Sequence, residues 1–532
     1  MNLSLCLSRL SRVAGWLCLV SPLPALSVPT PADWNGALAA IDAQIRAATG
    51  PTYQQGNAVN VLPGVIEARL EQKRVILVEA GFNWFAPAGA VGGYDYGNFF
   101  SFTGAAGQTD TQLRIVETTA ATLLFRRGYP NEPSRRLGAW WGDGYLSPEA
   151  TRDQLAVLAA WGSPLTGIYV VSVPAGTRML AGLTSPMQAD AEFRAGGAVQ
   201  YWLNSRENDW LVHALHAPDY LGSYVVAMTG AQKLNRELIG GLGTQLRDTA
   251  LRDDSGAAGV DNGVESWVRV STVDTDYRPL PDGEIAARGE SVLLGCGWTL
   301  AGSAATARVW AGAVVGRSTL RQRDERSGVA GRIDGNFGGL YAIYRRPSSD
   351  HFPWYVGGSV LHGRLWFDNT VPGYLGRGLE QRHRGMVVAG ALEVGVPLSF
   401  GTGWTVAPRA QLAASRIGRT AFRDELGAAV SVKRGHSGWA ELGAQVERVL
   451  LQRGDRRLAW WLSGVAVREF SGGPAVDVAG ETATGRRLGP AYQVDTGLRL
   501  GWAGRCSLQG AIGRVLDGER GCRGSASLTV AW

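Results

Sequence analysis

The sequence has no long apolar run and few cysteines. No internal segment approaches the roughly 20 consecutive apolar residues that a membrane-spanning helix needs, although 45% of the 532 residues are hydrophobic. Cys6 and Cys18 lie in the N-terminal segment, which leaves Cys296, Cys506 and Cys522. The first scarcity excludes a helical membrane bundle. The second excludes a disulfide framework, because an odd number of cysteines remains.

An excess of one charge is also missing. The formal net charge is +6, and the arginines are dispersed instead of forming basic blocks. A nucleic-acid partner is therefore not expected. Glycine (73 residues) and tryptophan (19 residues) are abundant instead. The mean hydropathy of −0.05 is typical of membrane-spanning strands, in which lipid-facing apolar and lumen-facing polar side chains alternate.

The first 27 residues have the pattern of a secretory signal peptide. Arg9 and Arg12 form a short basic region, and an apolar core follows from Val13 to Val20. A segment with prolines and small residues then ends at Ser27. We predict cleavage after Ser27, so residues 1–27 are removed from an exported protein.

Residues 265–532 are predicted to form twelve membrane-spanning strands. In the clearest of them, every second residue is charged, polar or glycine. Charged side chains at alternate positions cannot face hydrocarbon, so that face must line a lumen. The segments are Glu265–Val273, Glu290–Leu300, Thr306–Leu320, Arg332–Arg346, Pro353–Asp368, Arg384–Leu398, Trp404–Gly418, Ser437–Leu451, Leu458–Phe470, Ala491–Trp502, Cys506–Val515 and Gly521–Trp532.

The connections between these segments alternate between short and long. This asymmetry is typical of outer-membrane barrels, which have tight periplasmic turns and larger surface loops. A soluble β-sandwich is the alternative. It does not explain the alternation of the loops, nor the aromatic residues Trp298, Trp502 and Trp532 at strand ends.

A helix is predicted at Gly230–Asp253, immediately before the first strand. Leu234, Leu238, Leu242 and Leu246 recur every four residues and give it one apolar face. Small residues between them would let this helix fit a narrow pore. We therefore assign residues 229–264 to a linker and pore helix.

The helix, the twelve strands and the terminal Trp532, in this order, resemble the translocator of the classical monomeric autotransporters of type V secretion. The resemblance covers the chain from Gly230 to its end. It implies a monomeric barrel in outer-membrane lipid, inserted by the barrel-assembly machinery and plugged by the helix. It also implies that the upstream passenger is exposed at the cell surface.

The predicted passenger, residues 28–228, is short. Typical passengers of this family are long β-solenoids built from repeats, and no repeat is found here. Helical spacing occurs at 32–47, 61–72 and 147–161, and strand-like patterns occur at 113–126 and 166–174. We therefore expect a compact α+β domain.

One set of passenger residues resembles ADP-ribosyltransferase-like toxin domains. Those domains begin with an aromatic residue and an arginine on a strand and end with Gln or Glu near a glycine-rich turn. Phe125-Arg126 and Gly196-Gly197-Ala198-Val199-Gln200 are the matching segments. The resemblance implies that Arg126 holds the phosphates of NAD as a bidentate donor and that Gln200 orients the ribose or the acceptor. The paired glutamates of such domains are absent, and Ser147 is more simply interpreted as a helix cap.

His213, His216 and Asp219 are residue types that can bind a metal ion. The glutamate of a His-Glu-x-x-His motif is missing, so no metal site is expected. No cofactor is expected either, except NAD in the transferase alternative.

Two functions remain open. The first is a surface binding, adhesion or virulence module for a host ligand, with the aromatic residues of 81–102 as contacts. The alternative is a displayed transferase that uses Arg126 and Gln200. A solute pore is disfavoured because the helix and the passenger would block it.

Overall fold

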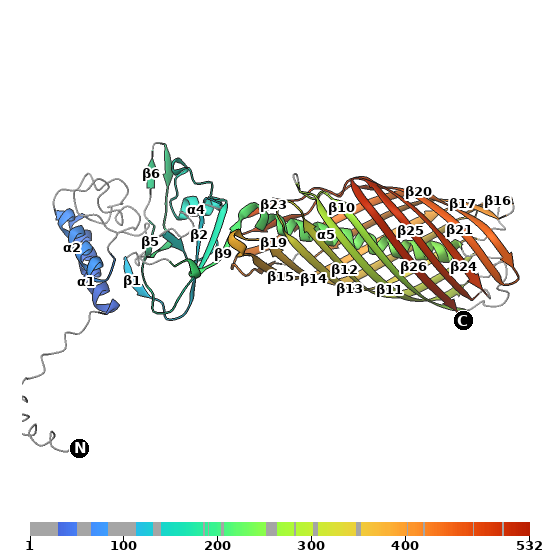
Figure 1. The fold of residues 1–532 in the computed structure, drawn as a ribbon, viewed down its shortest axis with the longest axis horizontal. Coiled ribbons are helices and arrows are strands. Elements are labelled where there is room, and N and C mark those ends of the chain that lie inside the picture. Colours follow the sequence, from blue (N-terminus) through green and yellow to red (C-terminus); the bar gives the residue numbers. More distant parts are fainter. Residues whose placement is uncertain are drawn as a thin grey trace, which may run out of the picture.

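The computed structural model shows an elongated barrel with a smaller domain at one end (Figure 1). The C-terminus lies at the opposite end of the barrel. The residues described are 30–49, 65–82, 113–130, 140–184, 187–189, 191–203, 207–251, 263–280, 283–301, 307–346, 353–401, 403–418, 421–471, 473–502 and 505–532. The predicted signal peptide, residues 1–27, lies outside them, as does the aromatic segment from residue 83 to residue 102.

Twelve antiparallel strands close the barrel, as predicted. The first strand pairs with the last, and β15 pairs with β17, so the ladder has no free edge. Ala491–Trp502 has the predicted bounds at both ends. The strands are β10 Val264–Tyr277, β11 Ile285–Ala301, β12 Arg308–Asp324, β13 Ala330–Arg345, β14 Tyr355–Val371, β15 Leu379–Gly395, β17 Trp404–Ile417, β20 His436–Arg453, β21 Arg456–Glu469, β24 Ala491–Trp502, β25 Cys506–Asp517 and β26 Glu519–Ala531.

The two faces of the barrel strands follow the predicted alternation. On β24, Leu498 is 51% exposed and faces outward, whereas Gln493 is 8% exposed and faces the lumen. The register of β25 and β26 places Cys506 opposite Val530 and Cys522 opposite Arg514, near opposite ends of the strand pair. All three cysteines in the described residues are free, as the spacing of the strands requires.

The outer loops contain more regular secondary structure than the sequence pattern predicted. Residues expected to be loops form a four-stranded sheet made of β18 Ala421–Arg423, β19 Ala429–Arg434, β22 Ala475–Val478 and β23 Glu481–Thr484. The short β16 Leu398–Phe400 and the 3-10 turn η5 Tyr374–Gly376 were also missed. These segments are too short for an alternation to be distinguished from chance, and partners distant in sequence stabilise them.

Helix α5, Ala217–Leu251, runs along the lumen of the barrel (Figure 1). The predicted start at Gly230 was wrong, because the helix begins just before Pro218 and Asp219. Proline and an acidic residue both suit the first helical turn. The proposed passenger boundary at Met228 therefore falls within this helix. Among the described residues, no helix is long and apolar enough to cross a membrane.

The N-terminal domain is built on a seven-stranded sheet with the order β1-β5-β8-β3-β2-β4-β9. Helices α1 Pro31–Thr49 and α2 Val65–Glu79 lie beside it, and α4 Pro148–Gln154 follows β3. A hairpin of β6 Met187–Ala189 and β7 Glu192–Arg194 projects from it. The strands are β1 Arg114–Glu117, β2 Thr122–Gly128, β3 Trp140–Gly142, β4 Gly167–Val173, β5 Arg178–Leu183, β8 Val199–Leu203 and β9 Leu211–His216.

This α+β domain has the predicted class, but several of its elements differ from the prediction. The single strand predicted at 113–126 is two strands. The helix predicted at 61–72 corresponds to α2, which spans Val65–Glu79 and so ends seven residues later than predicted. The helix predicted at 147–161 ends at Gln154 and is followed by the 3-10 turn η3 Ala159–Trp161. Ala156 between them has a φ of 48°, which an α-helix cannot accommodate.

Candidate functional site

Charged and polar side chains are concentrated in the lumen of the barrel, although one wall of the lumen is apolar. Helix α5 packs chiefly against β13 and β14. Leu234, Leu238 and Leu242 join a buried apolar cluster with side chains from those strands. A Cβ at Gly335 or Gly363 would overlap the Phe337 ring, so these glycines make room for that aromatic side chain.

Ion pairs anchor α5 to the other strands near its middle. Glu519 on β26 is 1% exposed. Lys233 Nζ donates to it at 2.8 Å and Arg236 Nη1 at 2.9 Å. Two buried cations therefore share one carboxylate, and each depends on it for its charge balance.

A second group of charges anchors the end of α5. Arg247 Nε donates to Glu393 at 3.1 Å, and Arg409 donates to both Glu393 and Glu441, at 3.1 and 3.2 Å. Asp248 accepts from Arg499, whose guanidinium also donates to Glu447 at 2.6 Å. These bonds connect the helix to five strands, β15, β17, β20, β24 and β26, directly or through one intervening residue.

The predicted transferase residues lie on the sheet of the N-terminal domain. Arg126 is on β2 and Gln200 is on β8, with β3 between them. Phe125, Gly142 and Gln200 form one row across the three strands. Two strand spacings put the Cα atoms at the ends of this row about 10 Å apart.

Alternation along β2 directs Arg126 and Gln200 to opposite faces of the sheet. Gln200 shares the face of Phe125, its row neighbour, whereas Arg126 shares the face of Leu124. Gln200 is also 4% exposed. The fold brings the two residues into neighbouring rows but does not aim both side chains into one space.

The adjacent Arg127 is buried at the junction with the barrel. Its guanidinium donates to the carbonyl oxygens of Leu146 at 2.7 Å and Leu165 at 3.0 Å, and to Glu481 on β23 at 2.7 Å. Tyr145 accepts a further bond from it, and burial raises the pKa of the Tyr145 hydroxyl. Sequence reasoning missed this arginine because its acidic partner lies far along the chain.

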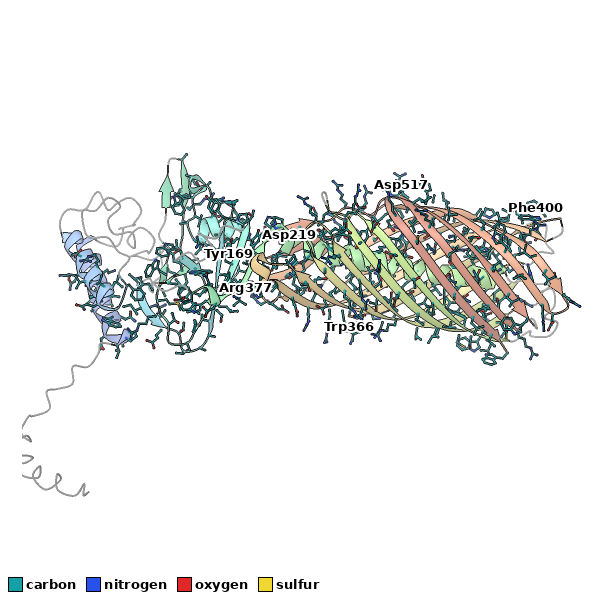
Figure 2. All side chains as sticks on the ribbon, viewed as in Figure 1. Tyr169, Asp219, Trp366, Arg377, Phe400 and Asp517 are labelled. Carbon is teal, nitrogen blue, oxygen red and sulfur yellow. The ribbon has the colours of Figure 1, made fainter. Side chains whose placement is uncertain are left out.

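A second contact joins β9 to the barrel loop that contains η5. The Nδ1 atom of His213 lies 2.7 Å from the Gly378 carbonyl oxygen, and the Ala214 N–H donates to the Arg377 carbonyl oxygen at 3.4 Å. The Arg377 guanidinium donates to the Leu211 carbonyl oxygen. Figure 2 shows Arg377 at the junction of the two parts. Burial lowers the pKa of His213, and its bond to Gly378 partly opposes that shift.

The two histidines considered as metal ligands face different partners and do not point to one common site. His213 is on β9, and His216 ends that strand with its Nδ1 atom 3.2 Å from Asp219. Across the described residues there is no group of three or more His, Cys, Asp or Glu side chains that could hold a metal ion. His213 bonds to the barrel loop at the junction, and His216 contacts Asp219 in the first turn of α5.

Comparisons with known proteins agree with this architecture. Residues 285–513 match the autotransporter beta-domain family. The pertactin autotransporter of Bordetella bronchiseptica is 29% identical over 150 residues, which are 28% of this chain and 16% of that relative. The adhesin BmaC autotransporter of Brucella suis is 32% identical over 119 residues, 21% of this chain and 4% of that relative. The chain therefore matches only a small part of either relative's length.

Among solved structures, the β domain of the Bordetella autotransporter BrkA covers 50% of this chain, and 98% of that structure is matched. The sequence identity is 18% and the TM-score 0.41. The closed barrel with a helix in its lumen defines a class, the outer-membrane translocators. Within that class residues 285–513 match the autotransporter β-domain, which supports an outer-membrane autotransporter whose upstream domain lies at the cell surface.

Proposed function

We propose that this autotransporter presents residues 28–228 at the cell surface as an adhesion module that recognises a ligand on a host surface. The supporting observation is the way the domain is held. Strand β9 continues directly into α5, and His213, Ala214 and Arg127 bond to barrel loops. A domain attached in this way transmits a binding force to the outer membrane. A relative whose name includes the word adhesin supports the same function.

Two exposed aromatic residues are the candidate contacts. Trp161 is 44% exposed and Phe193 is 60% exposed. They lie on neighbouring elements, because the Ala159 N–H donates to Glu192 at 2.8 Å and so joins η3 to β7. Exposed rings on a rigid element provide contact area at a small entropic cost. The earlier candidate segment begins with Phe82, which is 1% exposed and packs in the core.

Adhesion of intact cells to host-cell layers tests this function. The double variant Trp161→Ala/Phe193→Ala should lose most of the adhesion while its surface level, measured with an antibody, stays normal. Leu123→Ala is the matched control, since Leu123 is 45% exposed in the same domain and should retain wild-type adhesion. Protease treatment of intact cells establishes whether residues 28–228 are outside. Unchanged adhesion by the double variant contradicts the aromatic contacts. Unchanged adhesion after protease treatment contradicts the adhesion module.

A displayed transferase is the second candidate. Phe125-Arg126 lies beside the row that contains Gln200, although the Arg126 and Gln200 side chains project from opposite faces of the sheet. In this alternative Arg126 binds the phosphates of NAD. Arg126→Lys keeps the charge but loses the planar fork, and Gln200→Ala removes the amide. Both should abolish nicotinamide release from NAD by the full-length protein. Absence of any turnover by the wild type eliminates this candidate.

We also propose that the barrel-assembly machinery inserts the protein by reading its last strand. Trp532 ends the chain with 67% of its surface exposed. Deletion of Trp532 should reduce the heat-modifiable barrel in outer-membrane fractions. Normal levels after the deletion contradict this role.

A further inference from the structure

One side of the outer barrel surface carries a group of arginines. They project outward from the halves of β12, β13, β14 and β15 that are nearest the N-terminal domain, where exposed and buried residues alternate. The arginines are Arg317, Arg321, Arg323, Arg332, Arg364, Arg382 and Arg384, and the outward carboxylates among them are Asp334, Asp368 and Glu380. Cations therefore outnumber anions on this part of the barrel wall.

The carboxylates of this surface already have partners. Arg332 Nε donates to Asp334 at 2.8 Å, and Arg382 Nη2 donates to Glu380 at 2.9 Å. Asp368 lies 3.7 Å from the same Arg382. Three further arginines have neither a hydrogen bond nor an ion pair to any of the described residues: Arg317, Arg364 and Arg384. Their guanidinium groups are exposed and therefore open to an anionic ligand.

These three arginines, which we call the arginine cluster, are neighbours on the strand ladder. Arg317 and Arg364 are in one row, with Asn336 of β13 between them, so their Cα atoms are about 10 Å apart. Arg384 on β15 is the diagonal neighbour of Arg364, at about 7–8 Å. All three side chains project from the same face. The cluster therefore directs three planar guanidinium groups to one place outside the barrel.

The arginine cluster begins where the apolar outer surface of the barrel ends. Toward the periplasm, the nearest large apolar side chains that face outward on the same strands are Val315, Val360 and Met386, which are 58%, 59% and 49% exposed. Trp366 is directly opposite Arg384, and Figure 2 shows it at the outside of the barrel. Tryptophan is typical of the level of lipid headgroups. The cluster is therefore at the outer boundary of the bilayer, beside the surface that contacts acyl chains.

We propose that the arginine cluster binds a phosphorylated glycolipid of the outer leaflet. Guanidinium groups bind phosphate oxygens through paired, charge-assisted bonds. Two phosphate monoesters carry a charge of about −3 to −4 in total, which three arginines largely balance. Asn336 and Trp366 lie within the cluster and offer an amide and an aromatic ring to a sugar headgroup.

The position of the cluster favours a lipid over other sources of phosphate. A free phosphate ion would contact the arginines alone, and a soluble protein would not contact the apolar surface beside them. A lipid with phosphate groups on its sugar contacts both surfaces at once, because its acyl chains lie against Val315, Val360 and Met386 while its headgroup lies at the arginines.

Binding of lipid A, a glycolipid with two phosphate groups, tests the site. The purified full-length protein is titrated with lipid A in an uncharged detergent, and native mass spectrometry measures the bound fraction. A chelator in the buffer excludes bridging by divalent cations. The triple variant Arg317→Gln/Arg364→Gln/Arg384→Gln should weaken binding at least tenfold. Heat-modifiable migration shows that each variant retains the barrel.

A matched control removes the same charge elsewhere on the outer surface. Arg416, Arg468 and Arg514 are exposed, outward-facing arginines on β17, β21 and β25, and no two of these strands are neighbours. Arg416→Gln/Arg468→Gln/Arg514→Gln should therefore keep the wild-type affinity for lipid A. Equal losses in both triple variants, or unchanged affinity in the cluster variant, would overturn the proposal.

Two competitors distinguish the ligand classes. Inorganic phosphate at the concentration of lipid A should not displace it, since the ion lacks acyl chains. Phosphatidylglycerol has acyl chains but a single phosphodiester, and the wild type should bind it at least tenfold more weakly than lipid A. Displacement by inorganic phosphate, or equal affinity for phosphatidylglycerol, would contradict a site for a phosphorylated glycolipid.

Discussion

The barrel encloses many charged side chains beside an apolar wall, whereas the N-terminal domain has an apolar interior. In the barrel, leucines and valines face outward and charged residues such as Glu519 are enclosed. In the N-terminal domain, residues such as Trp202 and Leu180 form the interior. The difference follows from the solvent: hydrocarbon around the barrel takes the apolar side chains, and the lumen must then balance its charges in pairs. Burial in the N-terminal domain therefore depends on apolar packing, and burial in the lumen depends on electrostatic pairing as well.

Loss of a shared carboxylate should have the largest effect. Glu519→Ala leaves Arg236 buried without its carboxylate and Lys233 with only Glu237, 3.6 Å away, which should destabilise the folded protein by about 3–5 kcal/mol. The measurement is the heat-modifiable fraction in detergent as a function of denaturant. Glu284→Ala is the control, because its pair with Arg278 is largely exposed and should contribute about 0–1 kcal/mol. Equal losses from both variants would refute the pairing of charges in the lumen.

A similar loss should arise in the N-terminal domain for an apolar reason. Trp202 is 1% exposed and its ring centroid lies 5.8 Å from that of Phe82. Trp202→Ala should cost about 3–5 kcal/mol through lost burial and the cavity that remains. Proteolysis of the displayed domain on intact cells measures this loss, and Phe193→Ala, at an exposed position, serves as the control. Resistance to protease equal to that of the wild type would show that this core does not hold the domain.

A charge on the outer face should cost somewhat less. Leu498→Arg places a cation in hydrocarbon, at about 2–4 kcal/mol near the membrane midplane. Ser463→Arg is the matched inner-face variant, since Ser463 borders an open space beside α5 in the lumen. Gly497 is unsuitable, because a Cβ there would overlap the Gly510 carbonyl oxygen. Refolding yields in lipid vesicles should fall for Leu498→Arg far more than for Ser463→Arg, and the reverse order would show that the two faces are exchanged.

A helix cap in the N-terminal domain should matter less. The Ser147 hydroxyl oxygen accepts from the Ala150 N–H at 3.2 Å. Ser147→Ala should destabilise α4 by about 1 kcal/mol, and Ser147→Asn should restore most of the loss. Hydrogen exchange of the first turn of α4 provides the measurement. No change in exchange for Ser147→Ala would mean that tertiary contacts alone hold this turn.

Acidification should produce the smallest effect, at the contact between the two regions. Burial lowers the pKa of His213 below its ordinary 6.5, so the docked structure favours the neutral ring. The contribution of His213 to docking is complete above about pH 6.5 and is lost as the pH falls from there toward the lowered pKa. Hydrogen exchange at β9 should therefore rise below about pH 6.5 in the wild type and not in His213→Asn. A rise of the same size in both proteins would assign the pH dependence to other groups.

Much of the barrel was predictable because its information is local. Alternation predicted all twelve strands and, in the clearest of them, the outward face, as at Leu498, which is 51% exposed. Leucines every four residues predicted the pore helix from Gly230 onward, although not its start at Ala217. The sheet of the outer loops was not predictable, because β19 pairs with β22 from another loop.

The candidate sites show the same division. Arg126 and Gln200 were selected by residue type and spacing, and only the register showed that they project from opposite faces. Arg127 was not selected, because its partner Glu481 is 354 positions away. The pairing of Lys233 and Arg236 with Glu519 depends on the position of α5 in the lumen, and no local pattern carries that information.

The sequence by itself therefore determined the class of the protein, the number and faces of its strands, and the presence of a helix before them. Those features follow from periodicity against hydrocarbon and water, which each strand satisfies almost independently. The tertiary structure decided which carboxylate neutralises which cation, how the N-terminal domain rests on the barrel, and where α5 leaves room. These depend on contacts between residues far apart in the chain, whose energies arise only once the barrel has closed.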